Sequence, residues 1–372
     1  MLAAPGTTLL RAVPLTLSGD YFHELVSGRL RGAWPSVERG GLRLLAVPYG
    51  WASRLRNRLY DRGWKRQVRA GVPVVSVGNL TLGGTGKTPC VEYVASFYRQ
   101  RELRVAILSR GYGSDRGPND EALVLEENLP DVPHLQGADR AALAATAVEE
   151  LEREVLVLDD GFQHRRLARD LDLVLIDATN PWGHGYLFPR GLLREPASGL
   201  RRASAVLLTR CDQASEKDRG RIREEVARRA PEAPVAETVH RPLELVATDR
   251  RTAPLDRLKD RPAAAFCGIG NPAAFRRTLD DLGARLADFR TFPDHHAYTR
   301  SNVEDLRDWA RRQPADGTVL TTQKDLVKLP LPQLGGRDLW AVRIGLHFTN
   351  GQEELDRKLE EAVSAARMTN HE

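Results

Sequence analysis

The chain contains few cysteines and no long apolar run. Its three cysteines, Cys90, Cys211 and Cys267, lie far apart among 372 residues and form no C-x-x-C pair. This spacing indicates neither a disulfide framework nor a zinc site, and it fits a reducing compartment. No stretch approaches the ~18 apolar residues of a membrane-spanning helix, and the N-terminus lacks the basic and apolar regions of a secretory signal. We therefore expect a cytoplasmic protein that does not cross a membrane.

Acidic residues are scarce at the start of the chain. Residues 1–70 hold twelve Lys and Arg against four Asp and Glu, although the whole chain has a net charge of only +5. Trp51, Leu55 and Leu59 recur there at helical spacing among arginines. Such a stripe is typical of a helix in the headgroup region of an anionic bilayer, and the alternative is a basic helix packed on the core. No nucleic-acid-binding module follows, so we expect no nucleic-acid partner.

A glycine-rich turn with a Lys-Thr pair lies between an apolar strand and a helical segment. Its residues are Thr81, Leu82, Gly83, Gly84, Thr85, Gly86, Lys87 and Thr88. Glycines let backbone N–H groups converge on phosphate oxygens, the helix N-terminus adds positive potential, Lys87 reaches the terminal phosphates, and Thr88 can hold Mg²⁺. The pattern predicts a nucleotide-binding phosphate loop, although Thr81 stands where the usual pattern has glycine.

Continuous apolar runs alternate with helical segments along the rest of the chain. Strands are predicted at 105–108, 155–158, 173–176 and 205–208, and a second set begins at 263–266. This alternation predicts an α/β fold with a parallel sheet covered by helices on both faces, as in phosphate-loop NTPases. Prolines near 231–234 predict a boundary. We expect a basic N-terminal segment (1–70), a kinase-like core (71–233) and a smaller α/β domain (234–372).

Two adjacent aspartates follow the predicted strand 155–158. Asp159 and Asp160 would lie at the carboxyl end of a parallel strand, where ligands bind in open α/β sheets. Beside a phosphate loop, one of them would assist Mg²⁺ through water, because Mg²⁺ keeps much of its hydration shell. An Asp-Asp turn without function is the alternative.

Further polar motifs lie outside the predicted strands. Arg110 and Tyr112 could line a sugar or phosphate pocket or belong to a simple turn. The stretch 177–196 is a long loop without periodicity, a feature that is more often functional than not. His295 and His296 lack a third ligand at metal spacing, so we expect a pair near an anionic ligand rather than a metal site.

The ordered set of motifs resembles the tetraacyldisaccharide 4′-kinases, the lipid A 4′-kinase family. The matching segments are 77–89, 109–113, 159–164, 190–196, 266–272, 294–298 and 321–325. The resemblance covers roughly residues 20–365, and threonine at position 81 is typical of this family. Where the family tends to have Gly-Asp-Glu-Pro, this chain has Asn-Asp-Glu-Ala at 119–122.

The resemblance implies an enzyme that transfers the γ-phosphoryl group of ATP, with Mg²⁺, to the 4′-hydroxyl of a lipid-linked glucosamine disaccharide. It implies a peripheral protein at the cytoplasmic face of the inner membrane, with no protein partner evident. Asp120 would be the base, supported by a histidine of the His295–His296 pair. The other expected active-site residues are Arg110, Tyr112, Glu121, Arg140, Gln163, His164, Arg194 and Glu195.

The main alternative is a phosphate-loop NTPase that acts as a switch or metallochaperone. Residues 209–212 read Thr-Arg-Cys-Asp, which differs from the guanine-reading pattern Asn-Lys-x-Asp at the first two positions. A non-catalytic membrane-binding module is a third class, but it would leave Lys87, Asp159 and Asp160 without a purpose.

Overall fold

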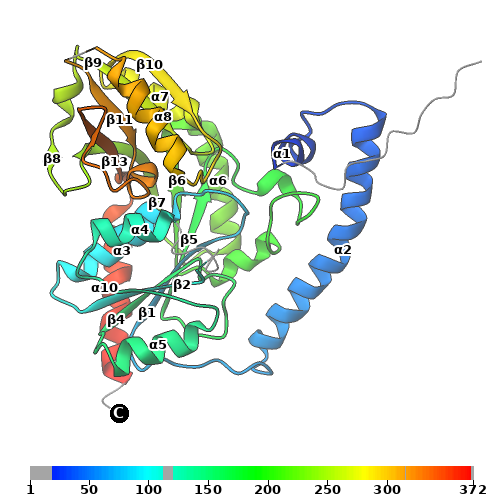
Figure 1. Ribbon diagram of the computed structural model, residues 1–372. Helices are drawn as coiled ribbons and strands as arrows, with labels where there is room; N and C mark the ends of the chain where they lie inside the picture. The colour runs from blue at the N-terminus through cyan, green and yellow to red at the C-terminus, as the bar shows by residue number, and fades with distance from the viewer. Residues whose placement is uncertain (1–18, 112–119, 315, 370–372) are drawn as a thin grey trace, which may run out of the picture.

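One large mixed sheet lies at the centre of the molecule (Figure 1). The computed structural model describes residues 19–111, 120–314 and 316–369. The strands are β1 (Val74–Asn79), β2 (Val105–Ser109), β3 (His134–Gln136), β4 (Val155–Asp159), β5 (Leu171–Asp177), β6 (Ala205–Thr209), β7 (Val235–Val246), β8 (Thr252–Ala253), β9 (Pro262–Cys267), β10 (Arg285–Thr291), β11 (Thr318–Thr322), β12 (Gln333–Leu334) and β13 (Arg337–Asn350).

Helices connect most of these strands. The α-helices are α1 (Gly19–Ser27), α2 (Ala33–Asp61), α3 (Lys87–Arg99), α4 (Asp120–Asn128), α5 (Arg140–Glu149), α6 (Glu216–Arg229), α7 (Pro272–Asp281), α8 (Arg300–Arg311), α9 (Gln323–Leu326) and α10 (Gln352–Thr369). Short 3-10 helices are η2 (Gly183–Gly185), η3 (Ala197–Arg202), η4 (Cys211–Gln213) and η5 (Leu255–Leu258). Helix α7 begins at Pro272, and Asn271 caps it by accepting from Ala274 N–H.

The sheet consists of two parallel parts joined by one antiparallel pair. Its order is β10-β9-β11-β13-β7-β6-β5-β1-β4-β2-β3, with β8 and β12 paired at the side. Neighbours from β7 to β3 are parallel, as are those from β10 to β13. The long strands β7 and β13 are antiparallel. The α/β prediction is confirmed, and β1 and β4 lie side by side so that the phosphate loop and Asp159 share one edge.

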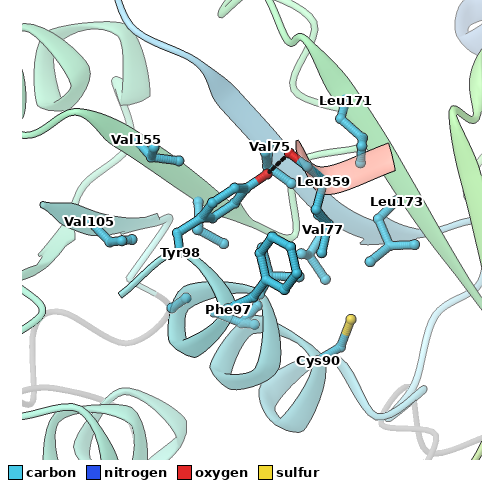
Figure 2. Close-up of a cluster of buried hydrophobic side chains, with 14 of the residues drawn as sticks. Val75, Val77, Cys90, Phe97, Tyr98, Val105, Val155, Leu171, Leu173 and Leu359 are labelled. Atoms are coloured by element: carbon cyan, nitrogen blue, oxygen red, sulfur yellow. Dashed lines mark hydrogen bonds between the residues drawn. The ribbon is translucent and has the colours of Figure 1, made fainter. Parts of the chain in front are cut away.

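Successive residues of the central strands pack on opposite faces of the sheet. Val75 and Val77 of β1 join a core formed with α3 and α10, whereas Val74 packs in a cluster that includes α5. Figure 2 shows the first core, in which the Tyr98 hydroxyl donates to the Leu359 carbonyl at 2.8 Å. Such alternation in strands buried on both sides explains their continuous apolar sequences.

The C-terminal helix returns to the first part of the sheet. Leu355, Leu359, Ala362 and Val363 of α10 belong to the core built on β1 and α3. The division at residue 234 stays a prediction. The structure adds that α10, which follows that boundary by more than a hundred residues, packs with the N-terminal half, because β13 ends beside β7 and delivers the chain there.

Helix α2 lies along one side of the body and leaves its outer face uncovered (Figure 1). On the inner side, the Tyr49 hydroxyl donates to the Arg194 carbonyl at 2.7 Å. On the outer side, Trp51 and Leu55 are 72% and 60% exposed. Trp51 and Leu55 of the stripe therefore do not pack on the core, whereas Leu59 is half-buried. No helix in the described ranges has the length and apolarity needed to span a bilayer.

Candidate active site

The glycine-rich turn leads from β1 into the N-terminus of α3. Lys87 and Thr88 are the first two residues of that helix, and Gly86 precedes it in the left-handed region at φ 84°. Gly83 and Gly84 are exposed, and a Cβ at either position would meet no atom within 4 Å. The turn thus leaves open space in front of a helix N-terminus, which is the arrangement that binds phosphate.

Threonine at position 81 is compatible with the turn. Thr81 is buried and is not among the described residues with positive φ, so it needs no glycine. The backbone around it pairs with the loop before η3: Leu82 N–H donates to Leu192 O at 2.7 Å, and Arg194 N–H donates to Leu80 O at 2.8 Å. The long loop 177–196 therefore holds the start of the phosphate loop in place.

The end of β6 holds the other side of the phosphate loop. The Thr209 hydroxyl donates to Thr85 O at 2.9 Å, and Arg210 donates to Gly84 O at 2.7 Å. Asn79 at the end of β1 donates to the Thr85 hydroxyl at 2.8 Å. These bonds occupy carbonyl oxygens of the turn and orient it, which preorganises the loop for an anion.

Gly86 has no room for a side chain, whereas Gly84 does, and this difference gives a first prediction. A Cβ at Gly86 would lie 2.8 Å from the His240 ring, at a positive φ. We expect Gly86→Ala to destabilise the fold by about 1–3 kcal/mol and to weaken ATP binding. Thermal unfolding and calorimetry measure both effects.

Gly84→Ala is the matched control for this prediction. Gly84 lacks a positive φ, and its Cβ would meet open space. We expect Gly84→Ala to unfold at the wild-type temperature but to bind ATP more weakly, because its methyl group enters the space that we assign to phosphate. A Gly86→Ala protein as stable and as tight as wild type would contradict this account.

Asp159 and Asp160 lie beside Lys87 at the end of β4. Burial raises the pKa of Asp159 to about 6, while Lys87 acts in the opposite direction. Burial also opposes ionisation of Asp160, but Lys87 and Arg194 outweigh it and lower its pKa. Lys87 Nζ is 3.5 Å from Asp160, and Arg194 donates to both oxygens of Asp160 at 2.8 Å. Two cations therefore keep Asp160 ionised beside the phosphate loop.

The donors present fit a hydrated Mg²⁺ bound together with a nucleotide. Oδ1 of Asp159 is buried and has no hydrogen-bond partner among the described residues. Those residues contain no cluster of three or more His, Cys, Asp or Glu side chains that could hold a metal. Mg²⁺ requires few protein ligands because phosphate oxygens and water complete its shell. Thr88 and the two aspartates are the residues that would hold it.

Glu195 is a buried carboxylate whose partners connect it to residues next to the phosphate loop. It is 2% exposed, and its carboxylate accepts from Asn57 at 2.7 Å, from Gln163 at 3.0 Å and twice from Arg202 at 2.9 Å. Gln163 also donates to Asn79 O at 2.9 Å. Glu195 thus ties α2 and η3 to the residues around the phosphate loop. Asn57 and Arg202, which no sequence motif indicates, belong to this network.

The remaining expected residues from the part of the sheet around β1 are His164, Arg140, Arg110 and Tyr112. Burial and the nearby charge of Arg140 lower the pKa of His164 to about 4, so its imidazole is neutral at pH 7. Arg140 starts α5, is buried, and lowers the pKa of Asp160. Arg110 follows β2 and is exposed. Tyr112 lies outside the described residues.

An acid–imidazole pair joins the two halves of the chain. Asp120 begins α4 and is buried, and its carboxylate lies 2.9 Å from Nδ1 of His295, which follows β10. Burial opposes ionisation of Asp120, but His295, Lys328 and Lys324 outweigh it and lower its pKa. Asp120 is therefore a carboxylate at neutral pH.

The structure brings only one histidine of the pair to Asp120. His296 stacks on Phe292 with ring centroids 4.8 Å apart, and its Nε2 lies 3.1 Å from Asn302 Oδ1. The resemblance implied that one histidine of the pair supports Asp120, without choosing between the two. The geometry separates them, because adjacent residues in this turn point in different directions and His295 has a positive φ of 56°.

Two lysines near α9 complete the acidic end of the site. Lys324 Nζ is 2.7 Å from Glu121, and Lys328 Nζ is 3.4 Å from Asp120. The negative charge of Glu121 also raises the pKa of Asp159, so the two acidic groups act on each other. Lys324 lies within the motif 321–325, and Lys328 lies just beyond it. Both lysines are about 200 residues from Asp120 in the sequence, so no local pattern indicates the contact.

Comparison with known proteins assigns the family. A family model described as tetraacyldisaccharide-1-P 4′-kinase matches residues 40–364. The chain belongs to this family. It is 43% identical over 327 residues to a tetraacyldisaccharide 4′-kinase of Anaeromyxobacter sp. strain Fw109-5, covering 83% of this chain and 87% of that protein. It is 37% identical to a kinase of the same name from Syntrophus aciditrophicus, covering 83% and 91%.

A solved kinase of this family has the same fold. The crystal structure of LpxK from Aquifex aeolicus, described as in complex with ATP, superposes with a TM-score of 0.71 at 31% identity. The match covers 87% of this chain and 99% of that one. The predicted family is thereby confirmed.

Proposed function

We propose that this protein is an ATP-dependent lipid kinase. It transfers the γ-phosphoryl group to the 4′-hydroxyl of a tetraacyl glucosamine disaccharide 1-phosphate, a step of lipid A biosynthesis. The observation that carries the proposal is the acid–imidazole pair of Asp120 and His295, next to Glu121, whose charge acts on Asp159 beside Lys87. Membership of the kinase family supports the same reaction.

The phosphate loop binds the triphosphate in this mechanism. Backbone N–H groups of the turn from Gly83 to the start of α3 would bind phosphate oxygens in the open space beside Gly83 and Gly84, and Lys87 exchanges its contact with Asp160 for the terminal phosphates. Mg²⁺, held by Thr88 and the aspartates, would neutralise charge that develops on the transferred group. Arg194 keeps Asp160 oriented through two hydrogen bonds. Most of the rate enhancement comes from positioning and charge neutralisation.

Asp120 accepts the proton of the attacking hydroxyl. Its carboxylate is ionised, lies at a helix N-terminus and is held by His295 across the two halves of the chain. His295 orients the carboxylate and stabilises it, while Lys324 holds the neighbouring Glu121. This arrangement serves an acceptor hydroxyl in line with the phosphate loop.

The lipid substrate places the enzyme at a bilayer, and α2 supplies the contact. Trp34, Leu44, Trp51 and Leu55 of α2, and Trp64 shortly after its end, are all at least 59% exposed. Exposed tryptophans and leucines flanked by arginines favour the headgroup region of an anionic membrane. We therefore propose a peripheral protein on the cytoplasmic face of the inner membrane. Arg56 has another role, because it faces the body and donates to the Gln163 carbonyl.

Replacing the stripe residues gives a second prediction. Trp51→Gln with Leu55→Gln should lower sedimentation with anionic vesicles by about tenfold or more, since each side chain loses apolar area that would be buried in the bilayer. Leu243→Gln is the control, because Leu243 is 51% exposed on β7, away from α2. Equal sedimentation of the double variant and wild type would refute membrane contact through α2.

The proposed reaction is tested with labelled ATP, Mg²⁺ and a tetraacyl disaccharide 1-phosphate in neutral detergent micelles. We expect label in the lipid fraction and one ADP formed per lipid phosphorylated. The switch or metallochaperone alternative instead predicts nucleotide consumption without labelled lipid, with a preference for GTP. That result would overturn the kinase assignment.

A further inference from the structure

A cavity of about 480 Å³ lies between the C-terminal part of α2 and η3. Arg54, Arg58 and Arg62 line it from the α2 side, and Arg201 and Arg202 line it from η3. A phosphate group fits easily within this volume. Five guanidinium groups concentrate positive charge around one space. The proposed kinase mechanism uses none of Arg54, Arg58 and Arg62.

The charge of the cavity is not cancelled by its own acidic residue. Asp61 also lines it, but Asp61 is paired with Arg165 at 2.7 Å and with Arg201. Arg202 is committed to Glu195. In the described part of the chain, no carboxylate lies within ion-pair distance of Arg54, Arg58 or Arg62. Three arginines therefore remain available to an anion.

A buried layer separates the cavity from the phosphate loop. Asn57 lines the cavity and donates to Glu195, and Arg202 lines it and donates to the same carboxylate. On the other side of Glu195 lies Gln163, which contacts Asn79 at the end of β1. The cavity is thus a second positively charged space behind the active site, and ATP in the phosphate loop does not occupy it.

The cavity borders the outward apolar stripe of α2. Trp51, Leu55, Arg58 and Arg62 follow one another at intervals of four, three and four residues, which places them along one helix face. Trp51 and Leu55 are largely exposed, and Arg58 and Arg62 are exposed as well. A bilayer that takes up Trp51 and Leu55 would bring lipid headgroups to the level of these arginines.

We propose that this cavity binds the phosphate of an anionic phospholipid headgroup while α2 lies on the membrane. The proposal rests on the membrane position given under the proposed function and adds a discrete lipid site to it. Guanidinium groups bind phosphate oxygens in pairs of parallel hydrogen bonds. A zwitterionic lipid carries its own cation, which the arginines repel, so the site selects net-negative lipids. The Ser198 side chain, also on the cavity wall, adds a hydroxyl donor.

The test compares two variant pairs of equal charge change. Arg58→Gln with Arg62→Gln removes two arginines of the cavity, and Arg66→Gln with Arg69→Gln removes two exposed arginines of the same basic segment that do not line it. Each protein is sedimented with phosphatidylcholine vesicles with and without phosphatidylglycerol. We expect the cavity pair to lose about tenfold more affinity for the phosphatidylglycerol vesicles than the control pair, with equal binding to phosphatidylcholine alone.

A variant of the other wall provides an independent measurement. Ser198→Glu places a carboxylate in the cavity from η3 without altering α2, and we expect it to reproduce the loss. Equal losses for the two arginine pairs would overturn the proposal, because they would reflect net charge alone. A fall in kcat/KM for the cavity pair in neutral detergent micelles would also overturn it and assign the cavity to the substrate's own phosphate. If wild-type protein does not sediment with either vesicle, the membrane position itself is wrong, whereas labelled lipid in the micelle assay still tests the kinase reaction separately.

Discussion

Lys87→Ala is expected to lower kcat by about 10²–10³-fold while the protein stays folded. Lys87 is the cation at the N-terminus of α3 that neutralises the terminal phosphates, and the loss of one such preorganised group costs that much. Its ammonium lies 3.5 Å from Asp160, but Arg194 still donates to both oxygens of that carboxylate after the substitution. Asp160 therefore keeps a partner, and we expect little change in thermal stability.

The control for this experiment is Lys217→Ala. Lys217 lies exposed on α6, so its removal changes net charge equally without touching the site. Steady-state kinetics in detergent micelles and thermal unfolding of both variants separate catalysis from folding. Normal turnover by Lys87→Ala would mean that the triphosphate binds elsewhere, and the assignment of the phosphate loop would have to be abandoned.

Asp120→Asn is expected to lower kcat by about 10²–10⁴-fold, the usual contribution of a positioned general base. The amide keeps the size of the side chain but accepts no proton, so KM for ATP should change little. Asp281→Asn, at an exposed position of α7, is the matched control. Retention of kcat by Asp120→Asn would exclude Asp120 as the base.

The pH profile gives a separate readout of the same residue. Burial opposes ionisation of Asp120, but the charges of His295 and Lys328 hold its pKa below the ordinary value. The base is thus already ionised throughout the neutral range, and its own contribution to activity is lost only when the pH drops toward that low pKa. Lys328→Ala removes one of the cations, so we expect the acidic limb of kcat/KM to move to higher pH. A limb that stays in place would show that Lys328 does not act on Asp120.

Local sequence patterns predict the phosphate loop and Asp159, but not the pairing of Asp120 with a histidine. The phosphate loop and Asp159 were predictable because each depends on a local pattern: an apolar strand followed by glycines and Lys-Thr, or by two aspartates. Parallel pairing of β1 with β4 then brings the two strand ends together. Asp120 and the histidine pair were named through the family resemblance, since nothing in their spacing relates residues 175 positions apart.

Several structural roles were beyond any reading of local pattern. Lys324 and Lys328 reach the acidic residues of α4 because β9, β11 and the loop after β10 meet there in space. Arg56 belongs by sequence to the basic helix yet faces inward to the Gln163 carbonyl. The helical period shows which residues share a face, but the packing of α2 on the body decides which face is covered.

The sequence by itself determined the α/β class, the glycine-rich Lys-Thr turn with two aspartates at the end of another strand, and the amphipathic character of α2. These depend on chemistry within a few neighbouring residues, where strand and helix periods and backbone freedom act directly. The tertiary structure alone decided that His295 rather than His296 meets Asp120, that α10 packs on the first half of the sheet, and that arginines of α2 and η3 enclose one cavity. Such contacts depend on how distant elements pack, and packing is a property of the whole chain rather than of any segment of it.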